Sequence, residues 1–216
     1  MAKIVVLKGG KGSGHKGHRG IPGVQGGSLP DDEAPQNYAV SSYDIITGNP
    51  ADQISEKDLH ILDDSITHVN KIVPSMNTSK LHFAIVPVIM GDVVGACTKY
   101  RNGPLKGQQI IAICPSKITK ALEIHGNALK SWNDIQEDLT YESYMRHTII
   151  HELGHRYWED NNIESSWTFG YNFNGVSGYG SYYKDVKESF ADAFAGFVLG
   201  YDMDSEVEKW FMENVE

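Results

Sequence analysis

A glycine-rich stretch near the start of the chain limits which residues can contribute to a folded core. Residues 9–35 contain a large share of the 22 glycines in the chain, together with three prolines and almost no large apolar side chains. Such a segment cannot bury enough apolar surface to offset the conformational entropy that it would lose on folding. We therefore expect residues 1–36 to form a disordered tail and residues 37–216 to form a single folded domain.

The overall composition is typical of a globular protein and argues against two classes of partner. Of the 216 residues, 40% are hydrophobic and 22% are charged, and the net charge is −9. An acidic surface repels phosphate groups, so we expect no nucleic-acid partner. The longest apolar run, near Phe83–Met90, is far shorter than the roughly 20 residues that a membrane-spanning helix needs, so we expect no membrane span.

The cysteines and the N-terminal residues bear on the compartment. Cys97 and Cys114 are the only two cysteines, which is too few for a disulfide framework. Two buried thiols are favoured, and a single bridge between them stays open. The apolar stretch that starts the chain is too short for a secretory signal, so we expect the protein to stay in a cytoplasm.

From Tyr38 onward, the apolar residues follow the spacings of an α+β domain. Ser55 is a candidate N-cap for a first helix that Pro74 would end. Residues 161–183 are rich in Asn, Ser, Gly and Tyr, which is typical of an irregular loop. Periodicity predicts helices at 55–73, 116–124, 140–160, 185–199 and 203–214, and strands at 81–89, 93–100 and 108–114.

The sequence His151-Glu152-Leu153-Gly154-His155 lies within the predicted helix 140–160. Residues four apart differ by about 40° around a helix, so both imidazoles leave the same side and can bind one metal ion. Glu152 is rotated by about 100° from His151, where a carboxylate can accept a proton from an activated water without being a ligand. Gly154 would let other backbone pack closely beside the site. Two surface histidines that share a helix face by chance are the less favoured alternative.

A hydrolytic zinc site also needs a third protein ligand and an open position. No histidine follows His155, so this ligand is a carboxylate or comes from upstream. The best candidate is Glu188, which lies one turn before Asp192 on the predicted helix 185–199. Asp192 could then accept the outer N–H of a ligating histidine and fix the orientation of that ring. Two ordinary exposed acids are the alternative interpretation.

These residues carry a resemblance to a known family. His151–His155 followed by Glu188 and Asp192 resembles the gluzincin metallopeptidases, and Ser177-Gly-Tyr179 with Glu188-Ser-Phe-Ala-Asp192 resembles the anthrax lethal factor type of catalytic domain. The resemblance covers residues 140–200. It implies a zincin-like α+β fold with a mixed sheet before the active-site helix, and a catalytic domain at 37–216. It also implies His151, His155 and Glu188 as zinc ligands and Glu152 as the general base.

The resemblance further implies a tyrosine that stabilises the oxyanion and a strand that binds substrate. The family's tyrosine position holds Ser181 here, so Tyr179 is the first choice and Tyr182 the second, with a packing role equally open. The small residues Gly95, Ala96 and Cys97 would suit an edge strand that pairs with the backbone of a peptide. An ordinary edge strand or loop is equally compatible with them.

The tail has a resemblance of its own. Residues 8–28, in which glycine recurs at every third position from Gly14 to Gly26 with histidines between, resemble a segment of bacteriophage minor head and other structural proteins. This resemblance implies a phage or prophage origin and a tail that docks on phage structural proteins. It would place the protein in a bacterial cytoplasm or on a virion.

Together these features predict a zinc-dependent metallopeptidase that uses Zn²⁺ to hydrolyse a protein or peptide substrate. Two alternatives stay open. One is a virion structural or interaction protein with a vestigial metal site, which the tail favours and the intact Glu152 opposes. The other is a zinc amidase that acts on cell-wall peptide.

Overall fold

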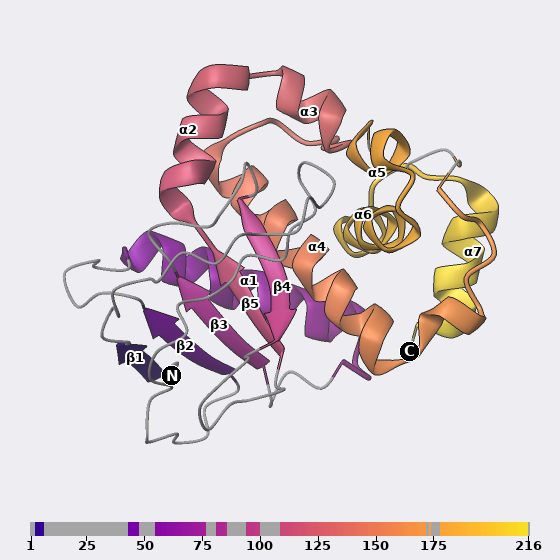
Figure 1. The fold of residues 1–216 in the computed structure, drawn as a ribbon, viewed down its shortest axis with the longest axis horizontal. Helices are drawn as coiled ribbons and strands as arrows, with labels where there is room; N and C mark the ends of the chain where they lie inside the picture. Colours follow the sequence, from indigo (N-terminus) through magenta and orange to yellow (C-terminus); the bar gives the residue numbers. More distant parts are fainter. Residues whose placement is uncertain are drawn as a thin grey trace, which may run out of the picture. The chain divides into compact units, whose positions relative to one another are not determined.

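The computed structural model describes residues 3–6, 43–47, 55–76, 81–85, 94–99, 109–171, 173 and 178–215. The architecture is mixed α and β, with strands concentrated in the first half of the chain and helices in the second (Figure 1). The chain divides into two compact units. A sheet unit comprises Met1–Leu59 and Asn77–Lys117, and a helical unit comprises His60–Met76 and Ile118–Glu216.

The sheet unit contains one mixed five-stranded sheet with the order β1-β2-β3-β5-β4. Neighbouring strands are parallel except for β4, which runs antiparallel to β5. All five residues of β5 are buried, as expected of an inner strand with apolar side chains on both faces. The strands are β1 (Lys3–Val6), β2 (Tyr43–Thr47), β3 (Leu81–Ile85), β4 (Gly95–Lys99) and β5 (Gln109–Ile113).

The first strand departs from the predicted tail. Lys3–Val6 pairs in parallel with Asp44–Thr47 at one end of the sheet. Its β-branched residues favour extended backbone, and so do those of the strand with which it pairs. These preferences outweigh the disordering effect that we expected from the glycines after this strand. The other residues of the predicted tail, including Gly14–Gly26 and the two histidines between them, lie outside the described residues.

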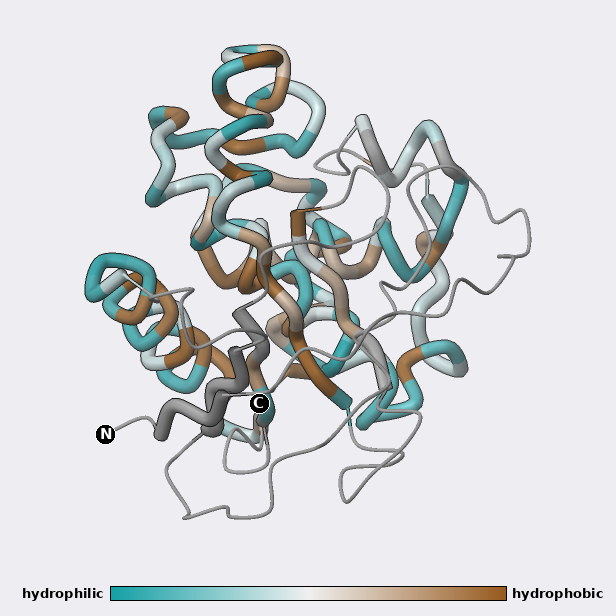
Figure 2. Tube along the Cα trace, turned by 60° about the vertical axis from the view of Figure 1, so that its left-hand side comes forward, coloured by the Kyte–Doolittle hydropathy of each residue, from teal (hydrophilic) through white to brown (hydrophobic). Residues whose placement is uncertain are grey.

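The helices of the chain agree closely with the periodicity of the sequence. Five of them match predicted helices within two residues at each end: α1 (Glu56–Ile72), α2 (Pro115–His125), α4 (Tyr141–Asp160), α6 (Val186–Leu199) and α7 (Ser205–Asn214). Around these helices hydrophilic and hydrophobic residues alternate (Figure 2). Within the described ranges no helix is both long and apolar enough to cross a membrane.

Three short helices were not predicted. They are α3 (Ala128–Trp132), η2 (Ile163–Ser165) and α5 (Gly178–Tyr183). The last two lie within 161–183, which we expected to be an irregular loop. Their glycines, serines and tyrosines have weak helical propensity, so local sequence did not predict them. Packing against another helix compensates for this weak propensity in α5. The backbone of Gly178 lies so close to Trp132 of α3 that an added Cβ would be 3.2 Å from its ring.

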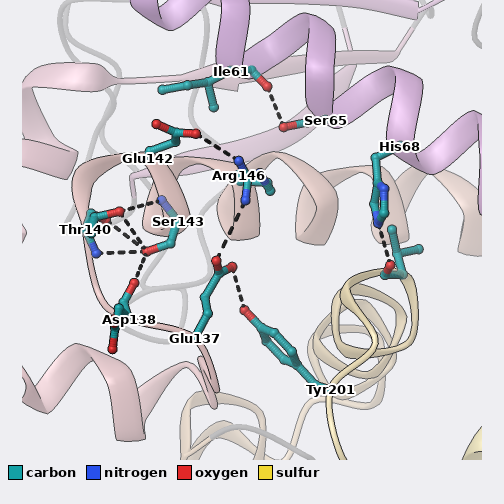
Figure 3. Close-up of polar contacts among 11 residues, drawn as sticks. Ile61, Ser65, His68, Glu137, Asp138, Thr140, Glu142, Ser143, Arg146 and Tyr201 are labelled. Carbon is teal, nitrogen blue, oxygen red and sulfur yellow. Dashed lines mark hydrogen bonds and ion pairs between the residues drawn. The ribbon is translucent and has the colours of Figure 1, made fainter.

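The core of the helical unit is aromatic. Phe190 and Phe194 of α6 are fully buried and contact Phe211 of α7, with ring centroids 5.5 and 6.3 Å from that of Phe211. The imidazole Nε2 of His68 in α1 lies 2.8 Å from the carbonyl oxygen of Val198, which ties α1 to the last turn of α6 (Figure 3). These contacts fix α6, the helix that carries Glu188 and Asp192.

Candidate metal centre

The helix α4 begins at a well-defined cap. Thr140, the predicted N-cap, accepts a hydrogen bond from the backbone N–H of Ser143 at 3.1 Å, and its own N–H donates to the Ser143 hydroxyl at 2.8 Å (Figure 3). This reciprocal pair satisfies two of the backbone groups that a helix start leaves unpaired. The cap lies three turns before His151, so His151, Glu152 and His155 occupy the ordered interior of a helix, as the sequence predicted.

Gly154 sets the distance between α4 and α6, which lie side by side (Figure 1). A Cβ added at Gly154 would lie 2.9 Å from the Ala191 Cα and 3.2 Å from both the Ala191 carbonyl oxygen and the Phe194 Cβ. Real Cβ atoms do not approach backbone so closely. The prediction that Gly154 lets other backbone pack beside the site is confirmed, and the backbone in question is that of α6.

This close approach brings three potential ligands together. The Nε2 atoms of His151 and His155 lie 3.1 Å apart, and the Glu188 Oε2 lies 3.2 Å from the first and 3.3 Å from the second. Their side chains are between 12% and 18% exposed, so the triangle is reachable from solvent. Among the described residues this is the one group of three or more His, Cys, Asp or Glu side chains with the proximity that a metal ion requires.

The donor set fits zinc. Four donors arranged tetrahedrally around zinc at about 2.0–2.1 Å lie about 3.3 Å from one another, and the three separations here match that edge within a few tenths of an ångström. Two imidazoles and one carboxylate are also a ligand set that zinc prefers. The triangle supplies three of four tetrahedral positions, which is the number found in hydrolytic zinc sites.

Asp192 lies on the other side of the His151 ring. Its Oδ1 is 2.8 Å from the His151 Nδ1, and its side chain is 4% exposed. An N–H at Nδ1 that donates to this carboxylate leaves the Nε2 lone pair directed at His155 and Glu188. The role of Asp192 in orienting a metal-binding histidine stays a prediction, with which this distance is compatible.

The charges around His151 favour a cation. Burial alone would lower the pKa of His151, but the charge and hydrogen bond of Asp192, together with Glu188, raise it well above its ordinary value. Burial would likewise raise the pKa of Glu188, but the two neighbouring imidazoles hold it far below the usual range of a carboxyl group. The Glu188 carboxylate thus remains ionised between the two rings, where a divalent cation would compensate its charge.

Glu188 owes its position to the start of α6. The side chain of Asp185 caps this helix by accepting hydrogen bonds from the N–H groups of Lys187 at 2.9 Å and Glu188 at 3.4 Å. Glu188 therefore lies in the first helical turn, where the positive end of the helix dipole favours a negative charge. Glu152, the predicted general base, is 7% exposed and lies in α4 between the two histidines.

The structure places the predicted tyrosines in α5. Tyr182 is 70% exposed, and its ring centroid lies 5.8 Å from that of Trp132. The side chain of Tyr179 lies outside the described residues. A role in oxyanion stabilisation stays a prediction for both residues.

The predicted substrate-binding residues lie in the sheet unit. Gly95, Ala96 and Cys97 belong to β4, which is the last strand of the sheet as the structure describes it. Pairing of this strand with a peptide stays a prediction. Cys97 and Cys114 are not joined by a disulfide. Cys114 is buried, as the favoured interpretation of two buried thiols expects, but Cys97 is only partly buried.

Sequence reasoning missed one residue next to the site. His147 lies one turn before His151 in α4 and is 3% exposed. Neither of its ring nitrogens has a hydrogen-bond partner in the described part of the chain. Burial lowers the pKa of His147 to about 4, despite the opposing charge of Asp192, so the ring is neutral at pH 7. The spacing of His147, His151 and His155, each four residues apart, was the available signal.

Comparisons of the chain with models of protein families, with curated protein sequences and with solved structures find no match.

Proposed function

We propose that this chain is a zinc-dependent metallopeptidase with a zincin-like catalytic fold. The observation that carries the proposal is the triangle of donor atoms from His151, His155 and Glu188, with separations of 3.1–3.3 Å. A site built only to hold a metal ion for stability closes the coordination shell with a fourth protein ligand. Three donors that are partly exposed, with Glu152 adjacent in the helix, support a hydrolytic site instead.

The chemistry divides between the ion and the side chains. A zinc ion held by the three donors would act as a Lewis acid and allow a water molecule to lose a proton near neutral pH. In the proposed reaction Glu152 accepts that proton as the oxygen attacks the peptide carbonyl carbon, and then donates it to the leaving nitrogen as the C–N bond breaks. Asp192 holds the Nδ1 proton of His151 throughout, which keeps the Nε2 lone pair available.

The remaining parts of the proposal extend the family resemblance. Tyr179, or Tyr182 after it, would donate a hydrogen bond to the oxyanion. Gly95, Ala96 and Cys97 would pair with substrate backbone in the manner of an added strand. We also propose a phage or prophage origin, action in a bacterial cytoplasm or on the virion, and docking of the tail on phage structural proteins.

Metal analysis combined with a protease assay tests the proposed function. The purified full chain should contain about one zinc ion per molecule and should cleave casein in a reaction that a chelator abolishes and zinc restores. Parallel incubation with peptidoglycan separates a peptidase from a cell-wall amidase. A metal-free chain, or a zinc-loaded chain inactive on both substrates, would contradict the enzymatic function, and the second result would favour a vestigial site.

Substitution of the proposed base gives a sharper test. Glu152→Gln keeps the size of the side chain but removes its ability to accept a proton. We expect zinc content to be unchanged and the rate of casein cleavage to fall by about 10²–10⁴-fold. Glu159→Gln, an exposed position later in the same helix, is the matched control and should keep full activity. Undiminished cleavage by Glu152→Gln would assign the base elsewhere.

A further inference from the structure

His147 is a buried polar side chain that the proposed reaction does not use. A buried imidazole without hydrogen-bond partners destabilises the folded state relative to an aliphatic side chain of similar volume. An unsatisfied polar group of this kind in a well-packed region calls for a physical explanation. The neighbours of the ring show what its flat shape contacts.

The His147 ring has two aromatic neighbours. The ring of Tyr201 is nearly parallel to it, with an interplanar angle of 12° and centroids 6.3 Å apart. The ring of His151 is tilted by 30°, with centroids 6.5 Å apart. His147 therefore contacts both a tyrosine from the segment between α6 and α7 and the ring of a candidate ligand.

Tyr201 is itself held in place from several directions. Its hydroxyl donates to the Glu137 Oε1 at 3.1 Å, and the other oxygen of Glu137 lies 3.7 Å from the Arg146 Nη1 (Figure 3). Its backbone N–H donates to the Gly196 carbonyl oxygen at 2.9 Å. The next residue, Asp202, exchanges two hydrogen bonds with the side chain of Gln136, at 2.6 and 2.7 Å. These contacts hold Tyr201 in one position, although it lies in the segment between two helices.

The orientation that the His151 ring needs explains why fixed neighbours matter. The ring of His151 must present Nδ1 to Asp192 and Nε2 to the donor triangle at the same time. A rotation of the ring about its bond to the Cβ would lose both contacts together. Asp192 holds one edge of the ring, and His147 lies beside the ring on the side of the preceding helical turn.

We propose that His147 is a positioning residue, whose flat ring, fixed by Tyr201, holds His151 in its metal-binding orientation. The role is one of shape, because the nitrogens of His147 make no hydrogen bond in the described part of the chain. This inference rests on the proposed metal site. It adds to that site a support built from the α6–α7 segment.

The dissociation constant for zinc, measured by competition with a chromophoric chelator, tests the inference without reference to catalysis. His147→Ala removes the ring and should weaken zinc binding by about 10–100-fold, as the loss of an orienting neighbour does at other metal sites. His147→Phe keeps a flat ring without nitrogens and should bind zinc within about threefold of the native chain. Tyr201→Ala should weaken binding in the same direction as His147→Ala, whereas Tyr201→Phe should not.

A second readout separates positioning from simple filling of the core. Substitution of cobalt(II) for zinc gives a visible spectrum that depends on ligand geometry, and we expect His147→Ala to change its intensity while His147→Phe does not. Val207→Ala, a core truncation in α7, is the control that lowers stability without touching the site. Should His147→Ala fail to fold, His147→Leu fills the volume without a flat ring and should weaken zinc binding in the same way.

Distinct results overturn the inference. Zinc affinity of His147→Ala within twofold of the native chain would make the residue a filler of space only. Folded His147→Phe that binds zinc as poorly as His147→Ala would transfer the role from the ring to its nitrogens. A native chain that binds neither zinc nor cobalt would remove the proposed metal site and this inference together, whereas the first two results leave the metal site intact.

Discussion

Two successive turns of α4 carry the same side chain in opposite states. His151 has carboxylates at both ring nitrogens, and its pKa lies well above the ordinary value. His147, one turn earlier on the same face, has no hydrogen-bond partner in the described part of the chain, and burial lowers its pKa to about 4. The His151 side chain is 13% exposed and His147 is 3% exposed, so both are largely buried and burial alone does not decide the behaviour of a histidine.

The difference lies in which side chains of α6 and of the segment after it face each turn. Glu188 and Asp192, one turn apart on α6, meet His151 at its two nitrogens. The ring beside His147 is instead Tyr201, whose hydroxyl is engaged by Glu137. Asp192 and Glu188 raise the pKa of His151 against the effect of its burial, whereas burial dominates at His147 and lowers the pKa of that ring. The function of a histidine on this helix is therefore set by the elements that face it.

The largest expected effect comes from removing the partnered ring. His151→Ala deletes one of three donors, so we expect the dissociation constant for zinc to rise by at least about a thousandfold. Glu188→Ala should have an effect of the same order. Competition with a chelator measures both, and His147→Phe is the matched control on the same helix. Stoichiometric, tightly bound zinc in Glu188→Ala would assign the third ligand to another residue, with Asp185 or Asp192 the nearest candidates.

Protonation of His147 should change how the free energy of unfolding depends on pH. The pKa of His147 is about 4 in the folded chain, below its ordinary value of 6.5, so the unfolded chain takes up the proton first. The stability that the neutral ring maintains is present above pH 6.5 and is lost as the pH falls from 6.5 to 4. We expect the free energy of unfolding of the metal-free native chain to fall over this range by about 3 kcal/mol more than that of His147→Phe.

Urea denaturation of both metal-free proteins at several pH values measures this difference. His151 and Glu188 titrate in both proteins, so their contributions cancel in the comparison. Parallel curves for the two proteins between pH 6.5 and 4 would contradict the neutral state of His147.

The spacing of α4 and α6 affects both turns and can be tested at Gly154. Gly154→Ala would press a Cβ onto the backbone at Ala191, 2.9 Å away, and we expect a loss of about 1–3 kcal/mol in the free energy of unfolding. Gly196→Ala is the control, because the one close neighbour of its Cβ would be the flexible end of Met203, at 3.2 Å, and the Tyr201 Cβ at 3.8 Å would be in ordinary contact. We expect the control to change stability by less than about 1 kcal/mol. Equal effects of both substitutions would show that α6 moves freely away from α4.

The smallest of these effects tests the outer carboxylate of His151. Asp192→Asn keeps the size of the side chain but weakens its hold on the Nδ1 proton. We expect zinc binding to weaken by about 10–100-fold while the ligand triangle stays complete. Glu213→Gln, on the exposed face of α7, should leave the affinity unchanged. An unchanged zinc affinity in Asp192→Asn would show that the contact with Asp192 does not orient His151. The positions of His151 and His147 would then differ less than their geometry indicates.

The parts of this structure that could be predicted are those specified by local sequence. The spacing of apolar residues predicts α4 and α6, and Thr140 marks the start of α4 by its side chain alone. The HExxH spacing fixes His151 and His155 on one face because both belong to one helix. Gly154 was identified for the same reason, although the sequence does not say which backbone approaches it.

The parts that could not be predicted depend on partners distant in sequence. Glu188 was proposed from its chemistry, and only the packing of α6 on α4 shows it at 3.2 Å from His151. The importance of His147 depends on Tyr201, which no local pattern connects to it. Strands β1 and β2 were missed because both are short and depend on pairing with distant strands: β1 pairs with β2, and β2 also pairs with β3.

The separation of the proposed ligands along the chain would have a mechanical consequence. His155 and Glu188 enclose residues 156–187, so an ion that binds both would tie the ends of this segment together as a reversible crosslink. The segment includes α5 and the exposed Tyr182. Binding and removal of the ion would then restrict and release a stretch of chain much longer than the site itself. The rate at which an added protease cuts between these two residues would report the occupancy of the metal site.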